Sequence, residues 1–143
     1  PMAQRFTAGE VVRSSGVDRE RLRGVTPRVH PDTVPVRTAP RWLMRVWVAG
    51  IQAMATPWAI YVTPAVFRRF VAGAEPAANG SLIVHELMHV EQVRRMGVVR
   101  HVMRYLADYL RGRYRGLGHW EAYRAVRAEQ EARAAAALVM GSW

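Results

Sequence analysis

The chain is 143 residues long and half of it is hydrophobic, which fits one globular domain. It contains no cysteine, which excludes a disulfide framework and leaves His, Asp and Glu as the side chains able to hold a metal ion. All 21 basic residues are arginines and the formal net charge is +10, a balance that suits an anionic partner or a membrane surface. Because the arginines are scattered from Arg5 to Arg133 without a dense run or a nucleic-acid motif, we do not expect nucleic acid to be the partner.

The first residues contain no long apolar run of the kind that a secretory signal requires. The most hydrophobic region, residues 42–67, is interrupted by polar residues and prolines such as Arg45 and Pro57, which argues against a transmembrane helix. We therefore expect a cytoplasmic protein.

Residues 1–40 are rich in arginine, proline, threonine and valine, and their hydrophobic periodicity is weak. Short helices fit residues 9–15 and 17–23, while the prolines between residues 25 and 38 favour an extended course. We expect an N-terminal arm that wraps over the core or covers an active-site cleft. Residues 41–143 would then form the functional domain.

Trp58, Ile60 and Val62 alternate with other residues in a pattern typical of a strand, and Pro57 restricts that strand to an edge or a start. The surrounding segments have apolar residues at helical spacing. Together these patterns predict an α+β, mainly helical fold with a small edge sheet. Helices are expected at residues 41–49, 66–72, 81–96, 98–110 and 119–140, with a glycine-broken basic loop at residues 111–118.

The helix expected at residues 81–96 contains one His-Glu-x-x-His pattern. His85 and His89 lie one turn apart on the same helix face, so their ring nitrogens can hold one zinc ion. Glu86 lies beside them and can act as a general base on an attacking water. The alternative is a buried helix whose histidines are satisfied by core hydrogen bonds. Since core helices seldom bury two histidines and a glutamate together, we favour the metal site.

Two histidines leave a catalytic zinc site incomplete, because such sites have three protein ligands and one open position. The residues that follow His89 contain no glycine and histidine in the arrangement that would supply a third ligand nearby. A glutamate from a later helix is the alternative source. The last expected helix offers Glu121, Glu129 and Glu131.

A strand at residues 58–62, a helix reading His-Glu-Leu-Met-His-Val-Glu-Gln at residues 85–92 and a later glutamate-bearing helix follow one another here. In these features, over roughly residues 58–137, the chain resembles the gluzincin metallopeptidases, in particular the small minigluzincin-like bacterial domains. The resemblance implies a compact zincin-like domain that binds Zn²⁺. It also implies Glu129 as the third ligand, because Glu129-Gln130-Glu131-Ala132 matches a family pattern with a small residue three positions after the ligand glutamate.

The sequence departs from that family at Arg133, where an acidic residue often supports a ligand histidine. Asp108 or a backbone carbonyl could take that role here. Glu121 remains the alternative third ligand. Glu131, rotated by about 200° from Glu129 on a helix, is expected to face solvent or an arginine.

With Zn²⁺ held by the two histidines and Glu129, the resemblance implies a metallopeptidase in which zinc activates a water and Glu86 takes its proton. A further side chain must stabilise the oxyanion, and Tyr123 is our first candidate. Other candidates in the last two helices and the loop between them are Tyr109, Tyr114 and His119.

The expected strand at Trp58, Ile60 and Val62 would bind an extended peptide or protein substrate along its edge. The expected function is therefore the zinc-dependent hydrolysis of peptide bonds. The alternative is a zincin-like module that binds a metal or another protein and has no catalytic activity.

Overall fold

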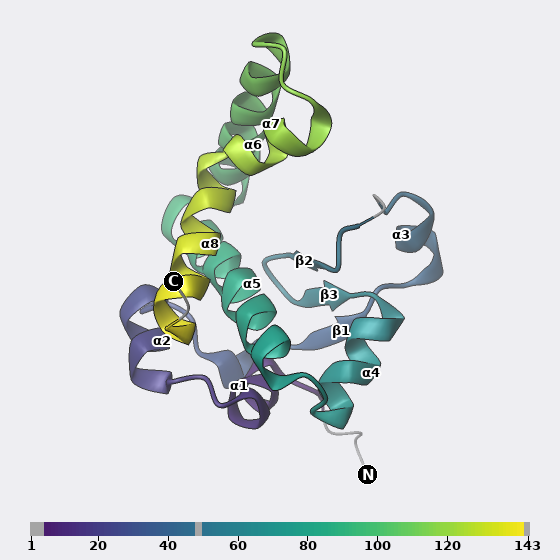
Figure 1. The fold of residues 1–143 in the computed structure, drawn as a ribbon, viewed down its shortest axis with the longest axis vertical. Coiled ribbons are helices and arrows are strands. Elements are labelled where there is room, and N and C mark those ends of the chain that lie inside the picture. Colours follow the sequence, from purple (N-terminus) through teal and green to yellow (C-terminus); the bar gives the residue numbers. More distant parts are fainter. Residues whose placement is uncertain (1–4, 48–49, 142–143) are drawn as a thin grey trace.

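The computed structural model describes residues 5–47 and 50–141 (Figure 1). This part of the chain is mainly helical and contains a three-stranded mixed sheet, so the expected α+β, mainly helical fold is confirmed. In chain order the elements are α1 (Ala8–Ser15), α2 (Arg19–Val25), the 3-10 turn η1 (Pro31–Thr33), β1 (Val36–Thr38), α3 (Arg41–Arg45), β2 (Ala53–Ala55), β3 (Ile60–Val62), α4 (Pro64–Ala72), α5 (Pro76–Met96), α6 (Val98–Tyr114), α7 (His119–Ala125) and α8 (Arg127–Met140).

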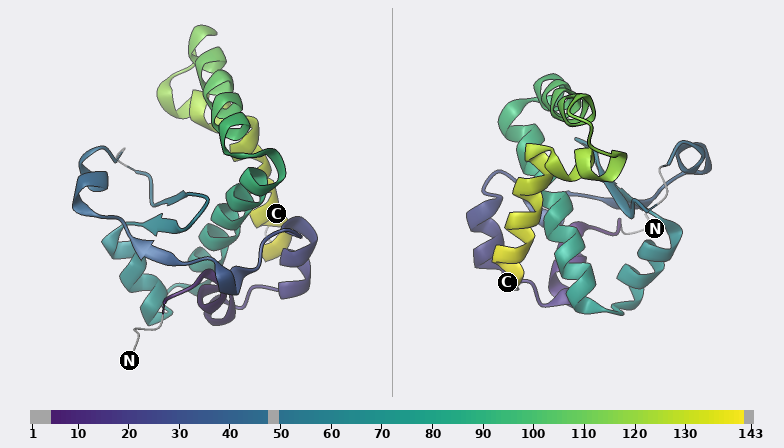
Figure 2. Two further views of the ribbon diagram at one scale, coloured as in Figure 1. Left: turned by 180° about the vertical axis from the view of Figure 1, so that it is seen from behind. Right: turned by 45° about the horizontal axis from the view of Figure 1, so that its top comes forward.

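Helix α5 is the centre of the fold. Its apolar residues Ile83, Val84 and Leu87 are fully buried, and α1 and α8 pack against it. It begins at Pro76, earlier than the expected Ser81, because a proline is well accommodated in the first helical turn. Figures 1 and 2 show α5 and α8 side by side, with the sheet on the other side of α5 and with α6 and α7 projecting from one end of this body.

The sheet has the order β1-β3-β2, with β1 parallel and β2 antiparallel to β3. The expectation that Trp58, Ile60 and Val62 form an edge strand is therefore wrong. Ile60 and Val62 belong to the central strand and are fully buried, while Trp58 precedes the strand and is 64% exposed. Pro57 does not force an edge position, since it lies in the turn between β2 and β3, outside the ladder. The edge strand next to α5 is β2.

The short helices expected at residues 9–15 and 17–23 are present as α1 and α2, but the described part of the N-terminal segment, residues 5–40, contributes to the core of the domain and is not a separate arm. Ala8, Val11 and Val12 of α1 are buried in the same hydrophobic cluster as Ile83 and Leu87 of α5. Strand β1 completes the sheet. The apolar positions of α1 stand at helical spacing, so burying them against α5 is favourable enough to order the segment. Residues 1–4 lie outside the described part of the chain.

The expected last helix, 119–140, is divided into α7 and α8 at Val126, whose backbone is extended. Asp108 of α6 explains the break, because its carboxylate accepts hydrogen bonds from the backbone N–H of Arg127 at 3.2 Å and from the guanidinium of the same residue at 3.0 Å. This interaction satisfies an N–H at the start of α8 that no residue of the helix can satisfy.

The helix expected at residues 41–49 ends at Arg45, and residues 48–49 lie outside the described part. Within residues 5–47 and 50–141, no helix is both long enough and apolar enough to cross a membrane.

Candidate metal centre

His85 and His89 of α5 meet Glu129 of α8 at one point in the interior. The Nε2 atom of His85 lies 2.9 Å from Oε2 of Glu129, and Nε2 of His89 lies 3.0 Å from Oε1 of the same carboxylate. The two Nε2 atoms are 3.2 Å apart. Each residue thus offers one ligand atom, and all three atoms lie within 4.8 Å of one another.

These separations suit a small tetrahedral cation. Zinc with nitrogen and oxygen ligands at roughly 2.0–2.2 Å requires neighbouring ligand atoms roughly 3.3–3.6 Å apart in tetrahedral geometry. The distances of 2.9, 3.0 and 3.2 Å are slightly shorter, so small side-chain rotations would admit the ion. Two imidazoles and one carboxylate are also a donor set that zinc accepts at catalytic sites.

The other two glutamates that the sequence offered as ligands lie elsewhere. Glu121 is exposed on α7 and is absent from the cluster. Glu131 accepts a hydrogen bond from Arg95 at 2.7 Å, which agrees with the expectation that it faces an arginine. Of the three candidates, only Glu129 lies beside both histidines, and it is 3% exposed.

Gln92 orients His89, a role that the sequence analysis missed. Its Nε2 group donates to the carbonyl oxygen of Ala128 at 2.9 Å and to Oε1 of Glu131 at 3.0 Å, so its amide oxygen must face His89. That oxygen lies 2.9 Å from Nδ1 of His89, which therefore carries a hydrogen. Nε2 of His89 is left as the atom that can bind a metal.

The sequence feature that could have identified this role of Gln92 is its position three residues after His89, which places both side chains on the same side of α5. Asp108, the residue considered for this supporting role, instead binds Arg127 at the start of α8.

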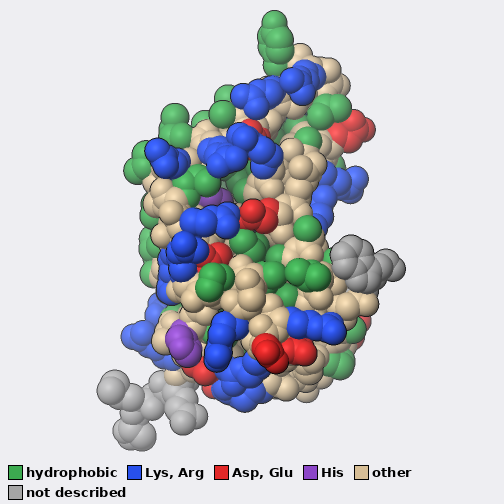
Figure 3. Space-filling model, turned by 90° about the vertical axis from the view of Figure 1, so that its left-hand side faces the viewer, with side chains coloured by type: hydrophobic (Ala, Val, Ile, Leu, Met, Phe, Trp, Pro, Cys, Tyr) green, Lys and Arg blue, Asp and Glu red, His purple; other side chains and the backbone are tan. Residues whose placement is uncertain are grey.

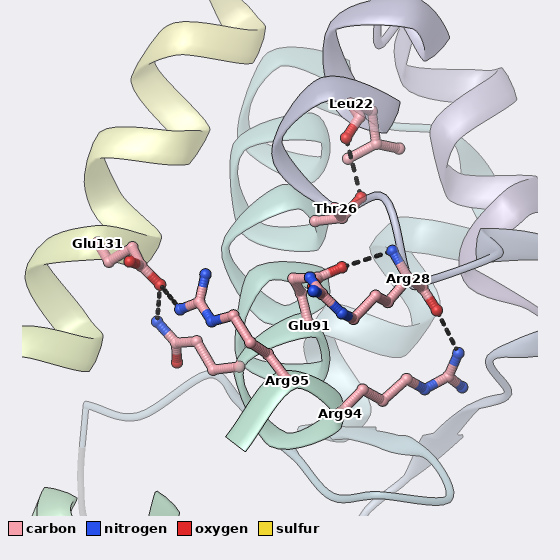
Figure 4. A network of polar contacts seen from close by, with 8 residues as sticks. Leu22, Thr26, Arg28, Glu91, Arg94, Arg95 and Glu131 are labelled. Carbon is pink, nitrogen blue, oxygen red and sulfur yellow. Dashed lines mark hydrogen bonds and ion pairs between the residues drawn. The ribbon is translucent and has the colours of Figure 1, made fainter. Parts of the chain in front are cut away.

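The half of α5 beyond the histidines is held in place from two sides (Figure 4). On one side, Glu91 is 1% exposed and accepts hydrogen bonds from the backbone N–H of Arg28 at 2.7 Å and from its guanidinium at 2.9 Å. Arg94 donates to the carbonyl oxygen of Arg28 at 2.9 Å. On the other side, Arg95 reaches Glu131 of α8. These contacts restrict the rotation of α5 about its axis, so the histidines on this helix keep their direction toward Glu129.

Among the candidate ligands, His89 and Glu129 form an ion pair. Burial alone would lower the pKa of His89, but its hydrogen bond to Glu129 and the charge of Glu86 raise that pKa to about 9. Burial would raise the pKa of Glu129, yet hydrogen bonds from His85 and His89 hold it far below its usual value. A metal ion and a proton thus compete for Nε2 of His89.

Glu86 lies beside the cluster without belonging to it. It is 5% exposed, and burial raises the pKa of its carboxyl, while the charges of His89 and His85 and a hydrogen bond with the backbone of Ala55 oppose that rise. A carboxylate with a raised pKa, held next to a metal site, is suited to general-base chemistry near neutral pH.

Tyr123 is the oxyanion candidate that the structure brings to this site, since it lines a cleft together with Glu86, His89 and Glu129. Burial and the charge of Glu129 raise its pKa, so it remains a hydrogen-bond donor. Tyr105 was not foreseen; its hydroxyl donates to Oε1 of Glu129 at 2.9 Å, and burial with the Glu129 charge raises its pKa as well.

The remaining candidates are more distant from the ligands. Tyr109 lines the cleft, but its hydroxyl shares a hydrogen bond of 2.9 Å with Nδ1 of the exposed His119. Tyr114 is 93% exposed at the end of α6. A third unforeseen residue, after Gln92 and Tyr105, is His101, which lines the cleft with its ring centre 6.4 Å from that of His89.

Two clefts have Glu86 in their walls. One of about 510 Å³ lies between β2 and α6 and is mainly apolar, with Met54, Val102 and Leu106 in its walls. The other, of about 460 Å³, extends toward α7 and is lined by Arg124 and Arg133. Ile51, Ala53, Glu86 and Tyr123 border both clefts.

The outer edge of β2 faces these clefts. Thr63 donates to the carbonyl oxygen of Gln52 and Thr56 donates to that of Ala59, so alternate residues of the β2 segment bond to β3. In an antiparallel pair the intervening residues, Ala53 and Ala55, turn their N–H and C=O groups away from β3. Both residues line the apolar cleft, and the backbone of Ala55 also contacts Glu86.

Comparison of the chain with models of protein families, with curated proteins and with solved structures finds no match.

Proposed function

We propose that this protein is a zinc-dependent metallopeptidase that hydrolyses peptide bonds. The observation that carries the proposal is the meeting of His85, His89 and Glu129 beside a buried, non-ligand Glu86. The open edge of β2 next to that carboxylate supports it further. This set of groups matches the chemistry expected from the His-Glu-x-x-His pattern and from the resemblance to gluzincins.

His85, His89 and Glu129 would hold the zinc ion, with Gln92 keeping the His89 ring in its binding orientation. Zinc at this position would lower the pKa of an attacking water and polarise the scissile carbonyl. Glu86 would take the proton of that water and return it to the amine that leaves. Tyr123, protonated at neutral pH, would donate a hydrogen bond to the developing oxyanion.

An extended substrate segment would bind along β2 by strand addition, using backbone groups of Ala53 and Ala55 that point away from β3. The substrate edge is thus assigned to β2 in place of the strand that contains Ile60 and Val62. The apolar cleft next to this edge, with Met54 and Leu106 in its walls, would receive an apolar side chain of the substrate.

The first test is the zinc content of the purified protein and of two variants. We expect one zinc ion per chain in the wild type and a large loss in Glu129→Gln. Glu121→Gln is the matched control, because Glu121 is exposed on α7 and should be dispensable. Loss of zinc in Glu121→Gln with full retention in Glu129→Gln would contradict the ligand assignment.

The second test separates a peptidase from a metal-binding module without catalytic activity. Glu86→Gln preserves the size of the side chain and removes the base, so zinc content and thermal stability should persist. Cleavage of an unstructured protein should fall by about 10²–10⁴-fold. A chelator should abolish wild-type cleavage and zinc should restore it. Absence of cleavage by zinc-loaded wild type would favour the silent module, and full activity of Glu86→Gln would refute the role of Glu86.

A further inference from the structure

Helix α6 is folded against the body along one narrow side only. Of its seventeen residues, only Asp108 and Gly112 are buried. Seven large apolar or aromatic side chains of the helix are exposed to 46–93%. We call these residues the α6 stripe: Val98, Val99, Val102, Met103, Leu106, Leu110 and Tyr114.

The stripe is continuous along the helix. Val99, Met103, Leu106, Leu110 and Tyr114 follow one another at steps of three or four residues, which places them on one face of an α-helix. The helix is about 25 Å long at 1.5 Å per residue. Within the described part of the chain nothing covers this face. In α1, by contrast, apolar residues at the same spacing are buried in the core. Such a long exposed apolar surface indicates a binding surface.

A row of arginines runs beside the stripe. Arg100, Arg104, Arg111 and Arg115 are spaced by four, seven and four residues, so they share a second face about 100° around the helix from the stripe. All four are exposed. Among the described residues, only Arg111 of these four forms an ion pair, at 3.6 Å with Asp108. In Figure 3, which shows one side of the molecule, arginine side chains likewise outnumber acidic ones.

The pairing of an apolar stripe with a cationic row argues for one kind of partner. A second copy of the chain is disfavoured because its α6 would bring a second arginine row close to the first, and like charges repel. The only acidic residue of α6, Asp108, is already engaged by Arg127 and cannot offset that repulsion. A peptide bound in a groove is disfavoured because Val99, Met103, Leu110 and Tyr114 of the stripe lie on the projecting helix outside the walls of the two clefts described above (Figure 2). An anionic membrane surface accepts apolar side chains at the acyl boundary and arginines among its lipid headgroups.

We propose that the α6 stripe and its arginine row bind the protein to the surface of an anionic lipid membrane. The helix would lie in the plane of that surface without crossing it. Val102 and Leu106 belong to the stripe and also line the apolar cleft of about 510 Å³. Docking would therefore bring the mouth of this cleft to the membrane surface. The proposal does not depend on metal binding or on catalysis.

Vesicle sedimentation tests the proposal directly, using phosphatidylcholine vesicles with and without about one third phosphatidylglycerol. Wild type should bind the anionic vesicles and should bind the neutral ones much less. Arg100→Gln/Arg104→Gln should weaken binding about 30-fold, since each arginine near the surface contributes about 1 kcal/mol. Met103→Gln/Leu110→Gln, outside the cleft wall, should weaken it at least tenfold. The matched charge control is Arg23→Gln/Arg68→Gln, on exposed positions of α2 and α4, which should bind nearly as well as wild type.

The absence of cysteine allows a second test that reports position. Leu110→Cys and Val71→Cys, at side chains that are 54% and 60% exposed, are each labelled with a polarity-sensitive fluorophore. Anionic vesicles should shift the emission of the label at position 110 to the blue and leave the label at position 71 unchanged. Failure of wild type to bind anionic vesicles overturns the proposal. So does an equal response at both labels, or a dimer that forms without lipid and is lost in Met103→Gln/Leu110→Gln.

Discussion

Helices α5 and α6 are neighbours in the chain and similar in length, yet they are used in opposite ways. Eleven of the 21 residues of α5 are buried, whereas α6 buries only Asp108 and Gly112 among its seventeen. Polar side chains enter the interior on α5, where they meet partners from α8 and from the loop after α2. On α6, apolar side chains remain outside. The comparison shows that neither the hydrophobicity of a residue nor its helical spacing decides burial; the presence of a partner element decides it.

The difference also explains where the candidate chemistry lies. Ligand atoms must be held to within about half an ångström, and a helix at the centre of the core achieves this better than a projecting one. On α5, Gln92 and Glu91 are both buried and bonded, and they restrict the rotation of the helix that carries the histidines. On α6, Tyr105 contacts Glu129 and Asp108 caps α8, while the exposed apolar face of the helix is available for another use.

The largest contrast is expected in stability. Leu87→Ala removes a fully buried side chain of α5 and should lower the free energy of unfolding by about 2–5 kcal/mol, because it leaves a cavity in the core. Leu110→Ala removes a side chain of α6 that is 54% exposed and should change stability by less than about 0.5 kcal/mol. Urea denaturation of the two variants measures both values. Equal losses would mean that α6 is packed in solution and that the contrast between the helices is false.

A smaller effect is expected at the contact that orients His89. Gln92→Leu keeps the bulk of the side chain and removes the acceptor of the Nδ1 hydrogen, so zinc affinity should fall by about 10–100-fold. Competition with a chromophoric chelator measures this change, with Gln130→Leu on the exposed side of α8 as the control. If both variants bind zinc as tightly as wild type, the ring of His89 is held by packing and Gln92 has no orienting role.

The smallest effect concerns the contact between Asp108 of α6 and the start of α8. Asp108→Ala removes the cap on α8 and should cost about 1 kcal/mol of stability at neutral pH. Hydrogen bonds from Arg127 hold the pKa of Asp108 below its usual value, so this carboxylate stabilises the fold above its unfolded pKa. The difference between wild type and variant should therefore shrink as the pH falls through the lowered pKa. Thermal unfolding at several pH values measures it, and a difference that grows toward acid would contradict this account.

Much of the site was predictable because its central part is local. The positions of His85, Glu86 and His89 on one helix follow from the helical repeat alone, and the structure places them on α5 as expected. The mainly helical class was also predictable from the spacing of apolar residues. Gly97 ends α5 and separates it from α6, at the boundary expected from the sequence.

The remaining parts of the site required tertiary structure because they join distant segments. Local sequence pattern does not distinguish Glu121, Glu129 and Glu131 as ligands. The packing of α8 on α5 brings Glu129 to the histidines. Gln92 has its role only because Ala128 and Glu131 take its amide hydrogens.

Strand order and burial were decided in the same way. Alternating apolar residues at 60 and 62 indicate a strand, but its central place depends on parallel pairing with β1, which is distant in the sequence, in addition to the local pairing with β2. The N-terminal residues have a helical apolar pattern too weak to order them alone, and contact with α5 supplies the burial that does so. Local periodicity thus determined which residues share a face in this protein, and long-range packing decided what each face meets.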